Sequence, residues 1–378
     1  MNNVQEININ NLKKLMDCYE ISIKQLAKKI SVSENTIKSW FNKTCAPTYP
    51  QLIKISESFK KPVIFFFMNN PKIEAAEYNF RMSQGFELVE NKKRIAELIG
   101  IGLAYRASLK DMFTAELKES CLSKLVDFYT NTREKFNDEL RNYLEFDIDK
   151  QTQFGRPTEV IEYLREKFFN QGIYVFKESF RLENVSGFCI YDDKFPIIML
   201  NNTVSFTRQL FTLFHELYHL ISKKSHIELL NFSEKECDRF AGEFLIPDIN
   251  IKIDVDLYKR TGKRTCEDEA FIKRMAQKYN VSYEAYCYRL LNIGEVSDTF
   301  YNDYSLMLKQ NVLRTGQDDI AGGNYYFTKM NYVGKTYLDN VVARFLAGKI
   351  PLRYVAQYTQ MKVPHVKKML FMMAGGRY

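Results

Sequence analysis

The chain has 378 residues, which are too many for one ordinary hydrophobic core and predict two or three domains. Its hydrophobic fraction of 46%, with 29 Phe and 24 Tyr against 16 Gly and 9 Pro, excludes a disordered or fibrous protein. The net charge of +8 comes from the two ends, because residues 1–70 hold ten Lys or Arg against five acidic residues and residues 301–378 hold eleven against four. Basic ends suit a polyanionic partner, although plain solvated surfaces also carry such an excess.

The sequence predicts neither a membrane span nor a disulfide framework. The longest apolar run, residues 63–68, is far shorter than the roughly 20 residues that a spanning helix needs. The polar start lacks the apolar stretch of a signal peptide. The seven cysteines are widely separated and include no CxxC pair, which argues against disulfides and a zinc ribbon. We therefore expect a cytoplasmic protein with reduced cysteines and no membrane partner.

Residues 1–68 are predicted to form a small helical bundle. Helical patterns cover residues 11–19, 22–30, 33–41 and 49–59, with a last short helix at 63–68. Ser22 and Ser33 are each placed to cap the helix that they open. Apolar residues fall where two crossed helices would bury them, at Leu26, Ala27, Ile30, Val32, Ile37 and Trp40. This spacing predicts a helix-turn-helix.

The rest of the chain divides into three further regions. Residues 69–150 are predicted to be a connector of amphipathic helices, without ligand spacing or phosphate-loop glycines. Residues 151–298 form the next domain, in which a helix at 158–170 precedes strands at 174–176, 187–190 and 197–200, the last two joined as a hairpin. Residues 299–378 form a C-terminal helical domain, with helices at 341–346 and 354–368. The predicted class is α+β, mostly helical, with a small sheet.

The helix predicted at residues 206–222 carries the sequence HELYH. His215 and His219 lie one turn apart on the same face, so both imidazoles can bind one metal ion. Glu216 lies beside that ion, where it can accept a proton from water acidified by the metal and deliver it to a leaving amine. The pattern predicts a catalytic zinc site in which Glu216 is the general base.

A five-residue motif also arises by chance in an amphipathic core helix, so its context matters. Only four His occur in the chain, and two of them occupy these positions. The rest of the helix is apolar, and an imidazole buried there without a partner is costly. A metal ion would satisfy both rings.

A catalytic zinc needs a third protein ligand and an open position. The next predicted helix starts at Ser233 and places Glu234 and Asp238 one turn apart. Glu234 can then bind zinc while Asp238 accepts the outer N–H of a ligand histidine. Glu236 is the rival ligand, but it points to another side of the helix and lacks an acidic partner in register. His226 is a weaker rival.

These residues resemble the ImmA/IrrE family of zinc peptidases, in the long form that carries an N-terminal Xre-like helix-turn-helix. The resemblance rests on HELYH preceded by Arg208 and Phe211-Thr212, on the segment from Glu234 through Cys237-Asp238 to Leu245-Ile246-Pro247, and on residues 196–201. It implies a zincin-like metallopeptidase domain with Glu234 as third zinc ligand and Cys237 in place of the family's Ala. It also implies a protein substrate, typically a repressor-like regulator cleaved in stress response or in control of a mobile element.

The predicted helix-turn-helix departs from the Xre pattern. Ile23 and Ser31 stand where Gln and Gly are usual, and Phe41 and Lys43 replace the usual Glu and Gly. If the domain binds DNA, four residues of its third helix would face the major groove: Asn35, Thr36, Lys38 and Ser39. The DNA phosphates would be contacted by Lys24, Lys28, Lys29 and Lys43. The alternative is a helical domain that docks a protein and reads no DNA.

Two functions therefore stand side by side. The first is a zinc endopeptidase whose substrate lies extended along an exposed strand edge, for which residues 197–200 are the candidate, with Arg208 as a substrate or structural anchor. The second is a DNA-binding transcription regulator whose metal domain senses zinc and hydrolyses nothing. Glu216→Gln discriminates between them, because it should keep the metal and abolish cleavage only in the first case. For the C-terminal region, packing, substrate docking and self-association into a homodimer all stay open.

Overall fold

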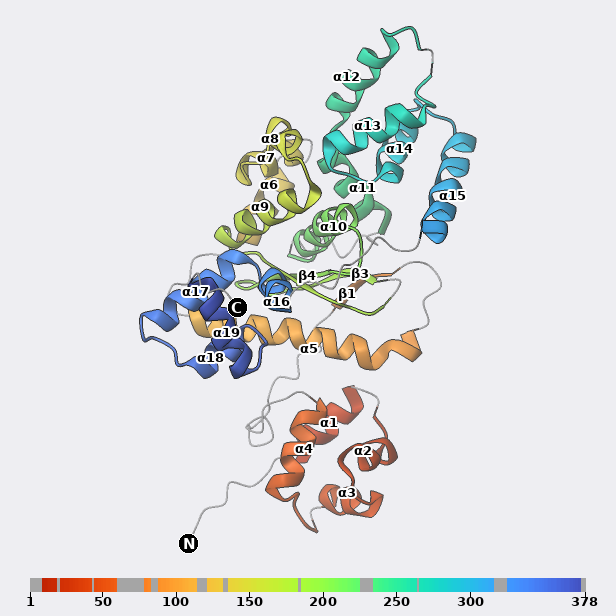
Figure 1. Cartoon of the computed structure of the whole chain (residues 1–378). Coiled ribbons are helices and arrows are strands. Elements are labelled where there is room, and N and C mark those ends of the chain that lie inside the picture. The colour runs from red at the N-terminus through yellow and green to blue at the C-terminus, as the bar shows by residue number, and fades with distance from the viewer. Residues whose placement is uncertain are drawn as a thin grey trace. The chain divides into compact units, whose positions relative to one another are not determined.

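The computed structural model describes residues 9–18, 21–42, 44–59, 78–82, 88–113, 121–131, 135–182, 185–224, 234–263, 265–315 and 325–374. The chain is mostly helical with one small sheet, as predicted (Figure 1). It divides into two compact units, Met1–Glu77 with Glu87–Ile101, and Tyr78–Phe86 with Gly102–Tyr378. None of the helices in the described ranges is long and apolar enough to cross a membrane. The helix predicted at 63–68, Lys43, His226 and Ser233 lie outside the described residues.

The first unit contains four short helices, close to their predicted bounds: α1 (Ile9–Cys18), α2 (Ile23–Ile30), α3 (Glu34–Phe41) and α4 (Tyr49–Phe59). The predicted caps are present. The Ser22 side chain accepts from the Gln25 amide in a full capping box, and the Ser33 side chain accepts from the Thr36 amide. The helices share a core that includes Leu26, Ile37 and Trp40. Its assignment as a helix-turn-helix stays a prediction.

The second unit is built around a four-stranded sheet of order β1-β3-β4-β2. Its strands are β1 (Tyr78–Met82), β2 (Tyr174–Glu178), β3 (Val185–Ile190) and β4 (Ile197–Asn201). β3 and β4 form the predicted antiparallel hairpin. β4 also pairs in parallel with β2 along its full length, so both of its edges are used. The prediction that residues 197–200 offer an exposed edge to a substrate is therefore wrong.

Helices surround this sheet. Before and between the strands come α5 (Leu88–Phe113), which has residues in both units, α6 (Cys121–Asn131), α7 (Phe136–Tyr143), α8 (Ile148–Gln153) and α9 (Pro157–Asn170). After β4 come α10 (Phe206–Lys224), α11 (Glu234–Leu245), α12 (Asp248–Lys259), α13 (Glu269–Tyr279), α14 (Tyr283–Asn292) and α15 (Asp298–Thr315). The C-terminal helices are α16 (Tyr325–Val333), α17 (Lys335–Leu346), α18 (Leu352–Tyr358) and α19 (Val363–Met373).

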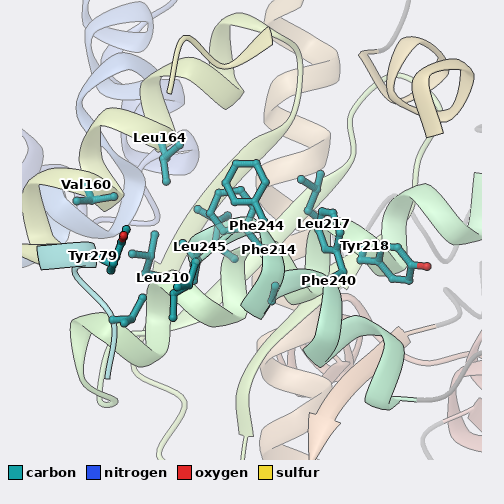
Figure 2. Packing of buried hydrophobic residues seen from close by; sticks show 14 of the residues in the cluster. Val160, Leu164, Leu210, Phe214, Leu217, Tyr218, Phe240, Phe244, Leu245 and Tyr279 are labelled. Atoms are coloured by element: carbon teal, nitrogen blue, oxygen red, sulfur yellow. The ribbon is translucent and has the colours of Figure 1, made fainter. Parts of the chain in front are cut away.

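Helices α10 and α11 pack against each other through aromatic rings (Figure 2). Phe214 stacks on Phe244 with ring centroids 4.0 Å apart, and Tyr218 stacks on Phe240 at 4.9 Å. Offset stacking of buried rings contributes about 0.5–1.5 kcal/mol per pair beyond their buried area. These two contacts fix the distance and rotation between the helices that carry the predicted metal ligands.

Gly187 of β3 lets α10 approach the sheet closely. A methyl group added at Gly187 would lie 2.4 Å from the Thr212 methyl carbon and 3.0 Å from the Met199 carbonyl oxygen. It would also lie 3.6 Å from Cγ of Glu216. Only glycine leaves room for the HELYH helix at this distance, so β3 forms the floor beneath Glu216.

The C-terminal helices are packed into the second unit. Arg165 of α9 is buried and donates to the carbonyls of Asn331 and Tyr332 at the end of α16. Tyr337 of α17 stands edge-on to Phe176 of β2. The predicted helix at 354–368 is instead two helices, because Gln360 adopts a left-handed backbone with φ of 53° that ends α18. Packing is thus one role of this region.

Candidate metal centre

The two histidines of HELYH converge as their spacing predicts. Their Nε2 atoms lie 3.2 Å apart on one face of α10. His215 is fully buried, and the His219 side chain is 10% exposed. Two nitrogens bound at about 2.0–2.1 Å in tetrahedral geometry would stand about 3.3 Å apart. The rings therefore already hold the separation that one zinc ion requires.

Helix α11 brings a carboxylate to the same point. Glu234 Oε2 lies 3.2 Å from Nε2 of His215, and its Oε1 lies 3.6 Å from Nε2 of His219. While the Nε2 atoms carry protons, hydrogen bonds from His215 and His219 hold the pKa of Glu234 well below its usual range. The carboxylate is consequently an anion beside two imidazole nitrogens, and the group that reaches both of them is Glu234, not its rival Glu236.

Asp238 of α11 faces the outer nitrogen of the His215 ring. Its Oδ1 lies 2.9 Å from Nδ1 of His215, the nitrogen that faces away from His219. An N–H at Nδ1 that donates to this carboxylate leaves Nε2 of His215 with its lone pair for a metal. The contact selects the tautomer that a metal ligand needs.

Cys237 has a role that sequence reasoning missed. Its buried Sγ lies 3.8 Å from Nδ1 of His219, so it faces the outer nitrogen of that ring as Asp238 faces that of His215. Burial, with Glu234 and Glu216 nearby, raises the pKa of the Cys237 thiol. Sγ also lies within 4.8 Å of ligand atoms on both histidines. Because Glu234 holds the Nε2 side, Cys237 is better placed to orient His219 than to bind the metal.

The residues present fit a zinc ion. Two imidazoles and one carboxylate match a catalytic zinc site with three protein ligands, which leaves one coordination position for water or substrate. Glu234 remains 62% exposed in its side chain, so the site opens to solvent on the α11 side. The chemistry supported at this point is that of a metal-dependent hydrolase.

Glu216 lies inside the protein, next to the histidines in sequence and directed to the sheet. The residue is fully buried and lies close to Gly187 of β3 and Thr212 of α10. The close approach of Gly187 and Thr212 was missed from sequence, although a glycine in a strand is the signal that marks close backbone approach.

Two further residues of the motif region have structural contacts. Arg208 donates from Nε to the Ser186 hydroxyl of β3 at 3.0 Å, so it ties the start of α10 to the sheet. The Tyr218 hydroxyl lies 2.7 Å from that of Tyr129, in a buried pair. Both residues support the position of α10, and the contact of Arg208 agrees with its predicted alternative as a structural anchor.

The residues of the first unit that are predicted to contact DNA differ in their exposure and in their contacts within the protein. Asn35 and Lys38 are exposed on α3. The Thr36 hydroxyl instead contacts Ser33, and Ser39 donates to the Thr36 carbonyl. Of the predicted phosphate contacts, Lys24 and Lys28 are exposed, whereas Lys29 donates to the Ser58 carbonyl at the end of α4.

Residues 170–291 match the model of the IrrE N-terminal-like domain of the M78 peptidases. This range contains strands β2, β3 and β4, helices α10 to α13, all of α14 but its last residue, and every predicted metal ligand. The match supports the resemblance to the ImmA/IrrE family and a metallopeptidase-type function, for which a protein is the substrate. No curated protein and no solved structure matches the chain.

Proposed function

We propose that the chain is a zinc-dependent endopeptidase with His215, His219 and Glu234 as zinc ligands and Glu216 as general base. The observation that carries the proposal is the convergence of three ligand groups, with Nε2 of His215 3.2 Å from Nε2 of His219 and 3.2 Å from the Glu234 carboxylate. The match of residues 170–291 to a metallopeptidase domain supports it independently.

Zinc bound to these ligands would supply a Lewis acid that polarises a peptide carbonyl and acidifies water. The protein's own groups would do the rest. Asp238 keeps the His215 ring in the tautomer that binds. Glu216, buried against β3, takes the proton of the attacking water and passes it to the amine that leaves. The resemblance to the ImmA/IrrE family favours a repressor-like regulator as substrate, in stress response or in control of a mobile element.

The test compares the wild type with Glu216→Gln in the native host, with and without stress. Proteins that are shortened only in the wild type are identified by mass spectrometry, and zinc content is measured for both purified proteins. We expect equal zinc and a cleavage product that only the wild type makes. Glu236→Gln is the matched control, because it makes the same charge change on α11 and should leave cleavage intact.

Two outcomes would argue against the proposal. If no protein is shortened differentially under any stress, the metal site is not that of a peptidase. If Glu216→Gln cleaves as well as the wild type, the base is another group. Equal regulatory phenotypes of the two proteins would favour the second candidate, a DNA-binding regulator with a metal sensor.

We also propose that α1–α4 form an Xre-like helix-turn-helix. The capped pair α2–α3 and the exposed Asn35 and Lys38 support it. Lys38→Glu should weaken binding of the full chain to double-stranded DNA, measured by fluorescence anisotropy, whereas an unchanged affinity would favour protein docking by this unit.

A further inference from the structure

Among the described helix pairs, three share a turn that begins from a buried alanine. They are α2–α3, α13–α14 and α18–α19. In each, the first helix is followed by one residue with a left-handed backbone: Ser31 with φ of 59°, Asn280 with 58° and Gln360 with 53°. A left-handed residue is a common helix end and also follows helices at Glu145, Gly294 and Gly348, so the comparison rests on the buried residues around the turn.

The backbone hydrogen bonds of the three turns also agree. The amide of the residue after the left-handed position donates to the carbonyl of a buried alanine five residues before it. These pairs are Val32 to Ala27 at 3.0 Å, Val281 to Ala276 at 3.0 Å, and Met361 to Ala356 at 2.9 Å. A small residue there lets the two helices cross closely, as in a helix-turn-helix.

The buried residues of the second helix fall at matching positions. Ten residues after the alanine comes a fully buried side chain, which is Ile37, Tyr286 or Val366. A second buried residue follows three positions later, and it is Trp40, Arg289 or Met369, so it is apolar only in the first and last of the three pairs. The pair α18–α19 thus repeats the core pattern of α2–α3, with no long stretch of identical sequence.

The turn by itself does not make a nucleic-acid surface, and α13–α14 shows why. Glu284, near the start of α14, accepts from the Ser305 hydroxyl of α15. Tyr288 on the same helix packs on Tyr301 of α15 with ring centroids 5.5 Å apart. Helix α14 is therefore covered and carries an acidic residue where a DNA reader would meet phosphates.

Helix α19 carries basic residues instead, and Tyr325 of α16 packs on His365 near its start with ring centroids 4.9 Å apart. Its exposed residues follow one face, at Val363, Pro364, Lys367, Lys368 and Phe371, opposite the buried Val366 and Met369. His365 lies at the border of this face, where its Nδ1 is 3.2 Å from the Tyr326 hydroxyl of α16. Pro364, Lys367 and Lys368 correspond to Asn35, Lys38 and Ser39 of α3.

The segment of sequence that contains α18 and α19 carries charge of one sign. Residues 340–374 contain six Lys or Arg and no Asp or Glu. Lys362 just before α19 and Arg353 on α18 are exposed as well. A basic face on the second helix of such a pair complements the phosphates that flank a major groove. The alternative partner is an acidic protein surface, and binding to it would not require the helix-turn-helix geometry.

We propose that α18–α19 is a second helix-turn-helix, and that α19 docks in the major groove of double-stranded DNA. Lys367 and Lys368 contact phosphates or base edges, Lys362 and Arg353 contact the flanking backbone, and Val363 and Phe371 provide apolar contact to the groove. This role is independent of the metal centre and of the predicted DNA contacts of α3.

The test measures anisotropy of a fluorescent 30-base-pair duplex of random sequence at several salt concentrations, with the full chain. Lys367→Glu/Lys368→Glu is compared with Lys252→Glu/Lys309→Glu, which makes the same charge change at exposed positions of α12 and α15. We expect the α19 variant to bind about tenfold more weakly than this control, and the slope of affinity against salt to fall by about 2 for two lost phosphate contacts.

The contribution of α3 is separated by repeating both double substitutions in a Lys38→Glu background, where the α19 effect should persist. Equal thermal midpoints of the variants establish that the fold is intact, as expected for exposed lysines. Equal DNA binding by the α19 variant and the control would overturn the proposal. The same holds if the α19 variant loses binding only to a single-stranded RNA of equal length, measured in parallel. Absence of duplex binding by the wild type at 50 mM salt would also overturn it.

Discussion

Helices α10 and α11 supply the two halves of the candidate metal centre, and they differ in burial. On α10, His215 and Glu216 are fully buried and rest on a strand whose Gly187 permits close contact. On α11, the side chains of Glu234 and Asp238 are 62% and 43% exposed. Figure 2 shows the apolar face by which the two helices meet.

The difference assigns distinct roles to the two helices. Packing holds the α10 groups in place, because a close-packed interior allows little rearrangement. The α11 groups are held by their contacts with the histidines, and they leave the solvent side open for a substrate. Changes on α10 should therefore affect both metal and stability, whereas changes on α11 should affect mainly the metal.

The largest effect is expected from loss of a ligand. His215→Ala should weaken zinc binding by more than the roughly 10- to 100-fold that changes beside a ligand cause. Glu234→Ala should have a similar effect, since its carboxylate contacts both rings. Zinc titration with a competing chelator measures this, with Glu236→Ala as control. Loss of zinc in Glu236→Ala alone would reverse the ligand assignment.

Gly187→Ala tests the close contact behind α10. The new methyl group would meet the Thr212 methyl at 2.4 Å, so we expect a destabilisation of about 1–3 kcal/mol, typical of overpacked cores. Thermal or urea unfolding measures it. Adding Thr212→Ser removes the clashing methyl and should recover part of the loss, although the Met199 carbonyl at 3.0 Å remains tight. Full stability of Gly187→Ala would show that α10 can shift away from the sheet.

Asp238→Asn keeps the shape of the side chain and removes its charge. Because the carboxylate orients His215 through Nδ1, we expect zinc affinity to fall by about 10- to 100-fold. The thermal midpoint of the metal-free protein should change little, since this side chain is 43% exposed. An unchanged zinc affinity would remove Asp238 from the metal centre.

The smallest effect is expected at Cys237. If its thiol orients His219, Cys237→Ala should lower zinc affinity by less than Asp238→Asn, and Cys237→Ser should restore part of it through a shorter hydroxyl contact. Competitive zinc titration of the three proteins gives this order. A loss for Cys237→Ala as large as that for Glu234→Ala would instead make the thiol a ligand.

Local patterns predicted much of the fold. The bounds of α2, α3 and α9 and the β3–β4 hairpin agree with the sequence, because caps, helical periodicity and short apolar runs act within a few residues. The split of residues 354–368 into α18 and α19 was missed, because a left-handed Gln360 carries no glycine signal. An alignment of the sequence on Ala27 and Ala356 would have shown that the buried positions of α18–α19 repeat those of α2–α3.

The sequence by itself determined that His215 and His219 share a helix face, since that follows from 3.6 residues per turn. Only the tertiary structure decided which acidic residue of α11 reaches them, because that depends on how Phe214 and Phe244 set the rotation between two helices. Tertiary pairing likewise placed β4 inside the sheet and Cys237 behind His219. Contacts between segments distant in sequence decide these features, and no local spacing encodes them.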